Sequence, residues 1–569
     1  MYILGLNAYH ADSSAALLKD GNVLFATEEE RFTRKKHWAG MPMKSIRFCL
    51  ESEGIGIQQI EAVCIGRDPK AKLDRKLLYA IKSPLSTVSL FSNRIRNRSD
   101  LQGIENMFIR EFGYCPPIKY VEHHRAHLAS AFFSSPFEEA AVVSIDGSGD
   151  FSTVMIGHGV GSRINVIESL DFPVSIGLLY TAFTQFLGFP YYGDEYKVMG
   201  LSPYGDPKYV DDVRKIIWPG KKRILEWDSS YFNINNGVIE YSNMEPIPST
   251  LFVKSKFERI FGMARMKNEQ IDKRHKDIAC SLQRVTEELI FSIVEKAHKL
   301  TGSCNITIAG GVAQNSVANG KIIKNTSFDN LYIPSAGHDA GIAMGSAQFY
   351  YFNVLNQPRV EALYNANLGI QFDNEQIGEK LKELNLEFRF LEDNLLFKYL
   401  AKKIASEKVI GFFDGAAEFG PRALGSRSIV ADPRNPRAQA LLNEKIKKRE
   451  SFRPFAPSIL EEFGAEYFED YQFTPFMERV LSINPTKRAS IPAVTHVDGS
   501  GRLQSVRKEL RPRYYNLISS FYELTGIPIL INTSFNENEP VVNLPEEAID
   551  CFLRTDLDIL VLGNYILEK

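Results

Sequence analysis

The chain has 569 residues, of which 44% are hydrophobic and 24% are charged. This composition is typical of globular proteins and argues against a disordered chain. A formal net charge of −2 argues against bulk binding to nucleic acid or to a membrane surface. The six cysteines form no CxxC pair, so we expect neither a thiolate zinc site nor a disulfide scaffold, and we expect a cytoplasmic location. The sequence also predicts no signal peptide and no membrane span.

The N-terminal part contains a strand–loop–strand pattern twice. An apolar strand at 2–8 leads into the polar loop 10–14, and a strand pair at 15–18 and 23–27 follows. A similar pattern returns at 142–156 with a Gly-rich loop. The repetition predicts a duplicated unit, and the alternative is a chance likeness between two hairpins.

Two histidines and a carboxylate form the first candidate site. His123 and His127 are four residues apart, which places both imidazoles on one face of a helix. Asp146 follows a buried strand at 140–145 and precedes a Gly-rich turn. These residues could hold a divalent metal against a phosphate, or they could be surface histidines beside an ordinary turn. Asp339 stands at a predicted helix start, either as a fourth ligand or as an N-cap.

Less regular segments surround this pattern. The charge run 28–37 predicts either a solvated face or, because it lies near the first polar loop, contact of Lys36 and His37 with an anion or substrate. The segments 70–103 and 208–268 are poorly patterned. We interpret the first as an insertion or a loosely packed helical segment, and the second as a lid or substrate-facing insertion.

A long amphipathic helix at 275–300 precedes a buried strand at 305–309. That strand ends in Gly310-Gly311 and opens a helix near Asn315. This arrangement suits nucleotide contact through backbone amides, and it equally suits close helix–strand packing.

The segment 358–371 is the best candidate for a linker, and a second α/β pattern follows it. Residues 422–453 carry nine basic and three acidic side chains, interleaved with apolar residues and prolines. Because arginine forks suit phosphate and carboxylate oxygens, this excess indicates a local anion site, with a solvated surface as the alternative. The predicted elements are strands 409–413, 527–531 and 559–562, the last being the final strand, the loop 419–428, and a helix at 546–553.

Taken together and in this order, the motifs resemble those of the NodU/CmcH family of carbamoyltransferases over nearly the whole chain. They are His-Ala-Asp-Ser-Ser-Ala, Glu-Glu-Glu-Arg-Phe-Thr-Arg-Lys-Lys-His, His-His-Arg-Ala-His, Asp-Gly-Ser-Gly, Ala-Gly-Gly-Val-Ala-Gln-Asn, Gly-Pro-Arg-Ala-Leu-Gly, Arg-Pro-Phe-Ala-Pro and Asn-Thr-Ser-Phe-Asn. The resemblance implies an α/β fold with an actin/Hsp70-like duplicated lobe at 1–357, which transfers the carbamoyl group. It also implies a YrdC-like lobe at 372–569, which makes carbamoyl-adenylate.

The implied substrates are carbamoyl phosphate and ATP with Mg²⁺. The implied acceptor is a hydroxyl or amine of a small, sugar-containing molecule. We expect no nucleic-acid or membrane partner, and a homodimer is compatible with the resemblance. Three alternatives remain: threonylcarbamoyl transfer in tRNA modification, carbamoyl transfer in hydrogenase maturation, and a non-enzymatic nucleotide-switched binding protein. The missing CxxC repeats disfavour the second, and the absence of a basic tail disfavours the first.

The resemblance also implies roles for individual residues. The metal ligands are His123, His127, Asp146 and Asp339, with Fe²⁺ favoured and Mn or Zn compatible. The nucleotide-binding residues are Gly147, Gly310, Gly311 and Asn315. The carbamoyl phosphate-binding residues are Arg422, Lys447, Arg449, Arg502, Ser534 and Asn536. The catalytic residues are His10, Asp12 and Lys36, with His10 as the candidate general base. The chain departs from the family pattern at Ala11, between His10 and Asp12, and at Glu537–Pro540, where other members have a longer turn.

Overall fold

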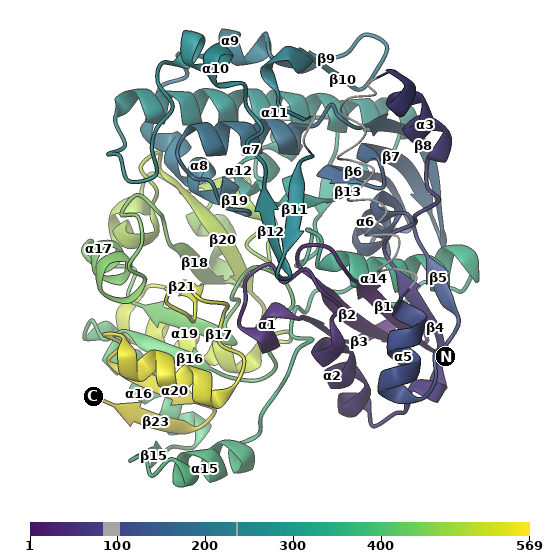
Figure 1. Ribbon diagram of the computed structural model, residues 1–569. Helices are drawn as coiled ribbons and strands as arrows, with labels where there is room; N and C mark the ends of the chain where they lie inside the picture. Colours follow the sequence, from purple (N-terminus) through teal and green to yellow (C-terminus); the bar gives the residue numbers. More distant parts are fainter. Residues whose placement is uncertain (83–102, 235–236) are drawn as a thin grey trace. The chain divides into compact units, whose positions relative to one another are not determined.

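The computed structural model describes residues 1–82, 103–234 and 237–569 (Figure 1). The chain forms two compact α/β units, Met1–Leu363 and Tyr364–Lys569. Their boundary lies within the segment 358–371. Parts of the predicted insertions 70–103 and 208–268 lie outside the described residues. Among the helices of the described ranges, none has both the length and the apolar character needed to cross a membrane.

The first unit contains two five-stranded sheets with the same topology. In each sheet, three consecutive strands form an antiparallel meander. The first strand of the meander also pairs in parallel with a fourth strand from later in the chain, and that strand pairs in parallel with the fifth strand of the sheet. The first sheet has the order β3-β2-β1-β4-β5, from β1 (Tyr2–Asn7), β2 (Ser14–Lys19), β3 (Asn22–Glu28), β4 (Ile60–Ile65) and β5 (Ile118–Tyr120). The second has the order β14-β13-β6-β7-β8, from β6 (Glu139–Gly149), β7 (Ser152–Val160), β8 (Arg163–Asp171), β13 (Asn305–Ala309) and β14 (Asn330–Tyr332). Read from its other edge, the second sheet is β8-β7-β6-β13-β14, which matches the order of the first sheet strand for strand. This match confirms the predicted duplication and rules out a chance likeness between two hairpins.

Equivalent helices follow the last strand of each sheet. Helix α6 (His123–Phe132) follows β5, and helix α14 (Gly341–Gln348) follows β14. The two helices pack against each other, and α14 also packs against β1, β2 and β4. The approach requires glycine: a Cβ on Gly5 would lie 1.8 Å from the carbonyl oxygen of Ala343, and one on Gly345 would lie 1.9 Å from that of Ala126. The starts of α6 and α14 are thereby fixed relative to each other.

The remaining elements of the first unit surround these sheets (Figure 1). The predicted long helix is α11 (Lys273–Thr301), which ends at Gly302 in the left-handed conformation at φ 68°. The second insertion forms two short hairpins, β9 (Ile217–Pro219) with β10 (Leu225–Trp227), and β11 (Ile239–Ser242) with β12 (Glu245–Pro248). The other helices are α1 (Glu30–Thr33), α2 (Met43–Glu53), α3 (Leu73–Lys82), α5 (Ile104–Phe112), α7 (Ile176–Phe186), α8 (Glu195–Leu201), α9 (Val210–Arg214), α10 (Lys254–Phe261), α12 (Ser316–Asn319) and α13 (Ile322–Asn325).

The charge run 28–37 is not a solvated face along its whole length, so that interpretation was wrong for its first residues. Glu28, Glu29 and Arg31 are buried. The Glu29 carboxylate accepts hydrogen bonds from the backbone N–H groups of Lys44 (3.1 Å) and Ser45 (2.8 Å), in the first turn of α2. Unpaired N–H groups at a helix start favour a carboxylate there.

The second unit is built on one nine-stranded mixed sheet, with helices covering both faces. Helices α15 (Asn374–Glu383) and α20 (Pro545–Arg554) pack on one face, and α16 (Asp393–Ala405) and α19 (Pro512–Thr525) pack on the other. Adjacent residues of a strand therefore belong to different cores, as with Phe413 and Phe412. In spatial order the strands are β15 (Arg389–Phe390), β23 (Tyr565–Glu568), β22 (Ile559–Leu562), β16 (Ile410–Phe413), β17 (Arg427–Ala431), β21 (Ile529–Ser534), β18 (Ala456–Leu460), β20 (Ser500–Val506) and β19 (Arg479–Ser482). The short helices are α17 (Ala438–Leu441) and α18 (Gly464–Tyr467).

One boundary prediction in this unit was wrong. The strand at 559–562 is not the final one, because β23 follows it and pairs with it in an antiparallel hairpin.

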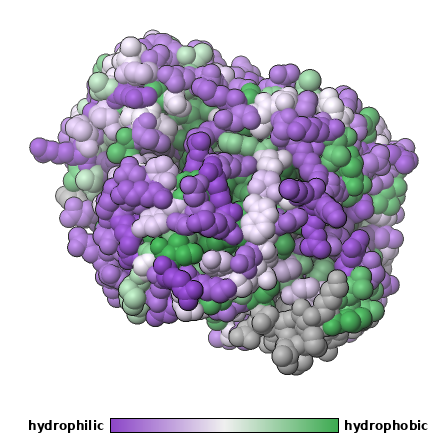
Figure 2. All heavy atoms as spheres, turned by 90° about the horizontal axis from the view of Figure 1, so that it is seen from above, coloured by the Kyte–Doolittle hydropathy of each residue, from purple (hydrophilic) through white to green (hydrophobic). Residues whose placement is uncertain are grey.

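Figure 2 shows that hydrophilic residues dominate one face of the molecule, with hydrophobic residues scattered among them.

Candidate active site residues in the two units

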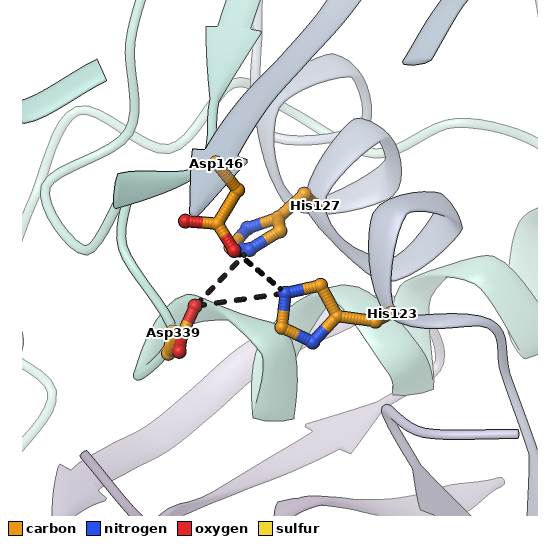
Figure 3. Close-up of side chains that lie close together, drawn as sticks. All are labelled: His123, His127, Asp146 and Asp339. Carbon is orange, nitrogen blue, oxygen red and sulfur yellow. Dashed lines mark hydrogen bonds and ion pairs between the residues drawn. The ribbon is translucent and has the colours of Figure 1, made fainter. Parts of the chain in front are cut away.

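Four side chains of the first unit converge on one point (Figure 3). His123 and His127 lie on α6, Asp146 lies on β6, and Asp339 lies in the turn before α14. His123 Nε2 is 3.1 Å from Asp146 Oδ2 and 3.7 Å from Asp339 Oδ1, and His127 Nε2 is 3.3 Å from Asp339 Oδ1. All four residues are buried, so the histidines are not surface residues. The side chain of Asp339 does not cap α14 either, because that helix has no side-chain cap.

The electrostatics of this histidine–aspartate cluster suit a cation. Burial and the neighbouring charge of Asp339 raise the pKa of Asp146, but the hydrogen bond and charge of His123 and the charge of His127 outweigh them, so the net pKa is lowered. Burial lowers the pKa of His127, which favours the neutral imidazole that a metal requires. Both nitrogens of His127 and Asp339 Oδ1 are buried and have no well-formed hydrogen bond. Buried polar atoms left in this way fit ligation by two imidazoles and two carboxylates, a donor set that suits Fe, Mn or Zn.

The predicted catalytic residues separate into two pairs. His10 Nδ1 lies 2.9 Å from Asp339 Oδ2, so His10 borders the histidine–aspartate cluster. Asp12 instead pairs with His37, whose Nδ1 is 2.7 Å from Asp12 Oδ1. Burial lowers the pKa of His37, but the charge and hydrogen bond of Asp12 outweigh this effect and raise the pKa to about 9. Asp12 and His37 both have positive φ, of 58° and 54°, and such backbone outliers cluster at functional sites. Lys36, next in the chain, is exposed.

The predicted nucleotide-binding residues have uneven surroundings. A Cβ on Gly147 would meet no atom within 4 Å, so a ligand has space there. Gly311 donates its N–H to Asp146 Oδ1 at 2.9 Å, and Gly310 donates to the carbonyl of Gly337 at 2.7 Å. Gly310 has φ 95°, and its Cβ would lie 2.3 Å from the carbonyl oxygen of Ile145, which supports the close-packing interpretation.

Asn315 has a structural role in this arrangement. Its side chain exchanges two 3.0 Å hydrogen bonds with Gln283 and accepts one from Ala318, at the start of α12. The helix that follows the paired glycines is also short, because a single 3-10 turn precedes the four-residue α12.

In the second unit, the structure brings together Lys447, Ser534 and Asn536, three of the residues expected to bind carbamoyl phosphate. Its ammonium donates to the carbonyl oxygens of Ser534 and Asn536, the latter at 2.7 Å, and to Asn536 Oδ1 at 2.7 Å and Ser534 Oγ at 3.3 Å. The four acceptors are all uncharged. Burial, followed by the charge of Arg449 and that of Arg453, lowers the pKa of Lys447 well below its ordinary value. A buried ammonium surrounded by neutral oxygens and further cations favours an anionic ligand.

Three arginines add to this positive charge. Burial and the guanidinium groups of Arg422 and Arg453 lower the pKa of Arg502 well below its ordinary value. The guanidinium of Arg449 lies 4.6 Å from the ring centre of Phe455, and its Nε donates to Asn443 at 2.6 Å. The charge of Arg449 acts on Lys447, whereas that of Arg453, which also pairs with Glu450 at 3.5 Å, acts on both Lys447 and Arg502. We call Lys447, Arg422, Arg453 and Arg502 the cation cluster.

Family models match both units. The model described as Carbamoyltransferase N-terminus matches residues 2–348, and the model described as Carbamoyltransferase C-terminus matches residues 401–569. The chain belongs to the carbamoyltransferase family. This membership makes it an enzyme of carbamoyl transfer and decides against the non-enzymatic alternative.

Relatives of this carbamoyltransferase cover its full length. It is 39% identical to a protein of Synechocystis sp. named "Uncharacterized protein sll1178", over 100% of this chain and 97% of that protein. It is 36% identical to "Nodulation protein NolNO" of Sinorhizobium fredii, over 99% of this chain and 80% of that protein. The solved structure of HypF from T. kodakarensis is similar at a TM-score of 0.32 and 12% identity, over 63% of this chain and 48% of that one.

Two residues at the sites were underestimated from the sequence. Arg453 opens the Arg-Pro-Phe-Ala-Pro motif, but it was assigned no role in the predicted carbamoyl phosphate site, and only its tertiary surroundings show that its charge acts on Lys447 and Arg502. His37 was considered together with Lys36, and the backbone turn at His37 directs that imidazole, not the lysine, toward Asp12.

Proposed function

We propose that this carbamoyltransferase is ATP-dependent. Carbamoyl phosphate and ATP give carbamoyl-adenylate at the second unit, and residues of the first unit then direct the carbamoyl group to a hydroxyl or amine of a small, sugar-containing acceptor. The observation that carries the proposal is the cation cluster. Of its four cationic side chains, Lys447 and Arg502 have pKa values that burial and neighbouring guanidinium groups lower well below normal, and such surroundings favour a multiply charged anion as ligand.

The atoms of the first stage balance only when one water molecule enters. Carbamoyl phosphate, ATP and water give carbamoyl-adenylate, phosphate and pyrophosphate. The P–O bond between the carbamoyl oxygen and the phosphoryl group breaks, and that oxygen forms a new bond to the α-phosphorus of ATP as pyrophosphate leaves. Negative charge accumulates on phosphoryl oxygens throughout, so fixed cations such as Lys447 and Arg502 stabilise the transition states.

The second stage transfers the carbamoyl group to the acceptor. The acceptor oxygen or nitrogen attacks the carbamoyl carbon, AMP leaves, and the acceptor loses a proton. His10 is our candidate to receive this proton, because its imidazole lies at the edge of the histidine–aspartate cluster, 2.9 Å from Asp339. Asp12, in the same loop as His10, and His37, in the loop after α1, orient each other through a 2.7 Å contact. His123, His127, Asp146 and Asp339 would hold a divalent metal, which supplies a positive charge for phosphate or carbonyl oxygens when bound.

The proposal is tested by exchange of labelled pyrophosphate into ATP. We expect exchange that depends on carbamoyl phosphate and is accompanied by release of inorganic phosphate. Exchange that is absent with carbamoyl phosphate would contradict the proposal. If threonine and bicarbonate supported AMP formation instead, the threonylcarbamoyl alternative would replace it.

A further inference from the structure

The loop that carries Arg422 is held in an unusual way by the protein around it. We call residues 419–426, between Glu418 and β17, the arginine loop. Arg427, directly after the loop, is fully buried, and its guanidinium lies 3.6 Å from the ring centre of Phe413. It donates hydrogen bonds to carbonyl oxygens at 3.0–3.2 Å, those of Asp414, Gly415, Ser426 and Ile370. Arg427 therefore fixes the C-terminal end of the loop, and Arg422, within the loop, is the member of the cation cluster whose charge acts on Arg502 together with that of Arg453.

The carboxylate of Glu418, the residue directly before the loop, accepts hydrogen bonds from backbone N–H groups in the second half of the loop. Its Oε1 accepts hydrogen bonds from the N–H groups of Leu424 (2.7 Å), Ser426 (2.7 Å) and Arg427 (3.4 Å). Glu418 is only 3% exposed. Several N–H groups that point at one place form an anion-binding nest. Here an anion of the protein itself occupies the nest, so these N–H groups are not offered to substrate phosphate.

Other contacts hold the loop from its opposite side. Gln504 Nε2 donates to the carbonyl oxygen of Leu424 at 2.8 Å, and Gly425 donates its N–H to Ser428 Oγ at 2.9 Å. Gly425 has φ 99°, and a Cβ there would lie 2.3 Å from the ring of Tyr514. The backbone around Leu424 is therefore held on both sides, two residues from Arg422.

We propose that Glu418 is a positioning residue for substrate binding: its carboxylate fills the nest of the arginine loop and thereby holds Arg422 in place beside Arg453 and Arg502. The inference rests on the proposed function, in which these arginines bind carbamoyl phosphate. It assigns to a buried acidic residue a role in binding an anion, which charge alone would not suggest. A carboxylate holds N–H donors more strongly than a neutral oxygen does, so the charge of Glu418 and not merely its shape should matter.

The test uses the full chain and two measurements. Calorimetry gives the Kd for carbamoyl phosphate, and steady-state pyrophosphate exchange gives its KM and kcat. Glu418→Gln keeps the shape and one acceptor oxygen but loses the charge, and we expect the Kd and KM for carbamoyl phosphate to rise about tenfold, with a smaller change in kcat. Glu461→Gln is the matched control, since Glu461 pairs with Arg507 in the same unit and does not contact the arginine loop. It should bind carbamoyl phosphate like the wild type.

Chemical rescue separates positioning from simple loss of structure. Glu418→Ala leaves three N–H donors around a space of carboxylate size, so we expect binding to weaken about 100-fold and added formate, but not chloride, to restore most of it. Unchanged binding by Glu418→Gln would overturn the inference, as would a folded Glu418→Ala protein that formate does not restore. If Glu418→Ala does not fold, the Glu418→Gln comparison decides. A wild-type protein that binds carbamoyl phosphate without pyrophosphate exchange would refute the proposed function and still leave the inference to be decided by the affinities, whereas one that does not bind it would overturn both.

Discussion

Replacing Lys447 with methionine should abolish adenylate formation and leave the protein folded. Methionine keeps a similar unbranched chain, so the packing around it is retained, but the ammonium and its four hydrogen bonds are lost. Loss of one preorganised charged donor to a phosphoryl transition state costs about 2.7–4 kcal/mol, which corresponds to about 10²–10³ in rate.

The effect on stability should be small because two contributions oppose each other. Removing a desolvated charge is neutral or stabilising by about 1–4 kcal/mol, whereas leaving the oxygens of Ser534 and Asn536 without their donor costs about 1–3 kcal/mol. We therefore expect the free energy of unfolding to change by no more than about 2 kcal/mol in either direction.

The difference should depend on pH in a defined direction. The native pKa of Lys447 is lowered, so between that value and about 10.4, the ordinary value, the unfolded chain binds more protons than the native one. The wild type should gain stability relative to Lys447→Met as pH rises through this window, because the penalty for the buried charge disappears when the amine loses its proton.

Pyrophosphate exchange and denaturant unfolding measure these expectations, with Lys448→Met as the control. Lys448 is exposed and pairs with Glu537 at 3.1 Å, so its replacement should leave exchange near the wild-type rate. The reasoning fails if Lys447→Met keeps more than about a tenth of the wild-type exchange rate, equivalent to about 1.4 kcal/mol. It also fails if the activity is lost together with several kcal/mol of stability, since Lys447 would then be structural.

Further predictions concern the first unit. His10→Ala should spare pyrophosphate exchange and block transfer, so that carbamoyl-adenylate accumulates in mass spectrometry; a loss of exchange equal to that of the Lys447 variant would contradict the division of labour. His127→Ala should strongly reduce the metal content of the purified protein in elemental analysis, and an unchanged content would place the metal elsewhere. The raised pKa of His37 contributes stability that is fully present below about pH 6.5 and is lost as pH rises through about 9. Asp12→Asn should therefore weaken the dependence of the free energy of unfolding on pH in this range, as measured by denaturation curves at several pH values. The same pH dependence in the variant and the wild type would refute the pairing.

The sequence predicted most strands and helices because their signals are local. The buried strand at 305–309 and the helix at 275–300 follow from apolar periodicity, and Gly302 ends that helix as expected. Predictions failed where a residue far away in the sequence determines whether a side chain is buried or a segment pairs as a strand. Glu29 belongs to a charge run that would be solvated in isolation, but α2 presents unpaired N–H groups to its carboxylate. The strand at 565–568 was missed because it has only four residues and follows a two-residue turn.

The candidate site shows the same division. The spacing of His123 and His127 fixes their shared face on any helix, whereas Asp339 is placed beside them by the packing of α14 on α6. Lys36 and His37 are neighbours, and no periodicity in an irregular loop tells which one faces inward. The positive φ at His37 directs its imidazole, and not the side chain of Lys36, toward Asp12, and the sequence does not predict this backbone conformation.

The duplicated topology has a consequence for the binding centre of the first unit. The loop after β1, with His10 and Asp12, corresponds in the second repeat to the C-terminal end of β6, with Asp146. The start of α6, with His123 and His127, likewise corresponds to the turn before α14, with Asp339. Corresponding positions thus carry a pair of imidazoles in one repeat and a carboxylate in the other. Neither repeat alone has all four donors, so the histidine–aspartate cluster exists only where the two repeats pack together, and a change in that packing would alter the cluster.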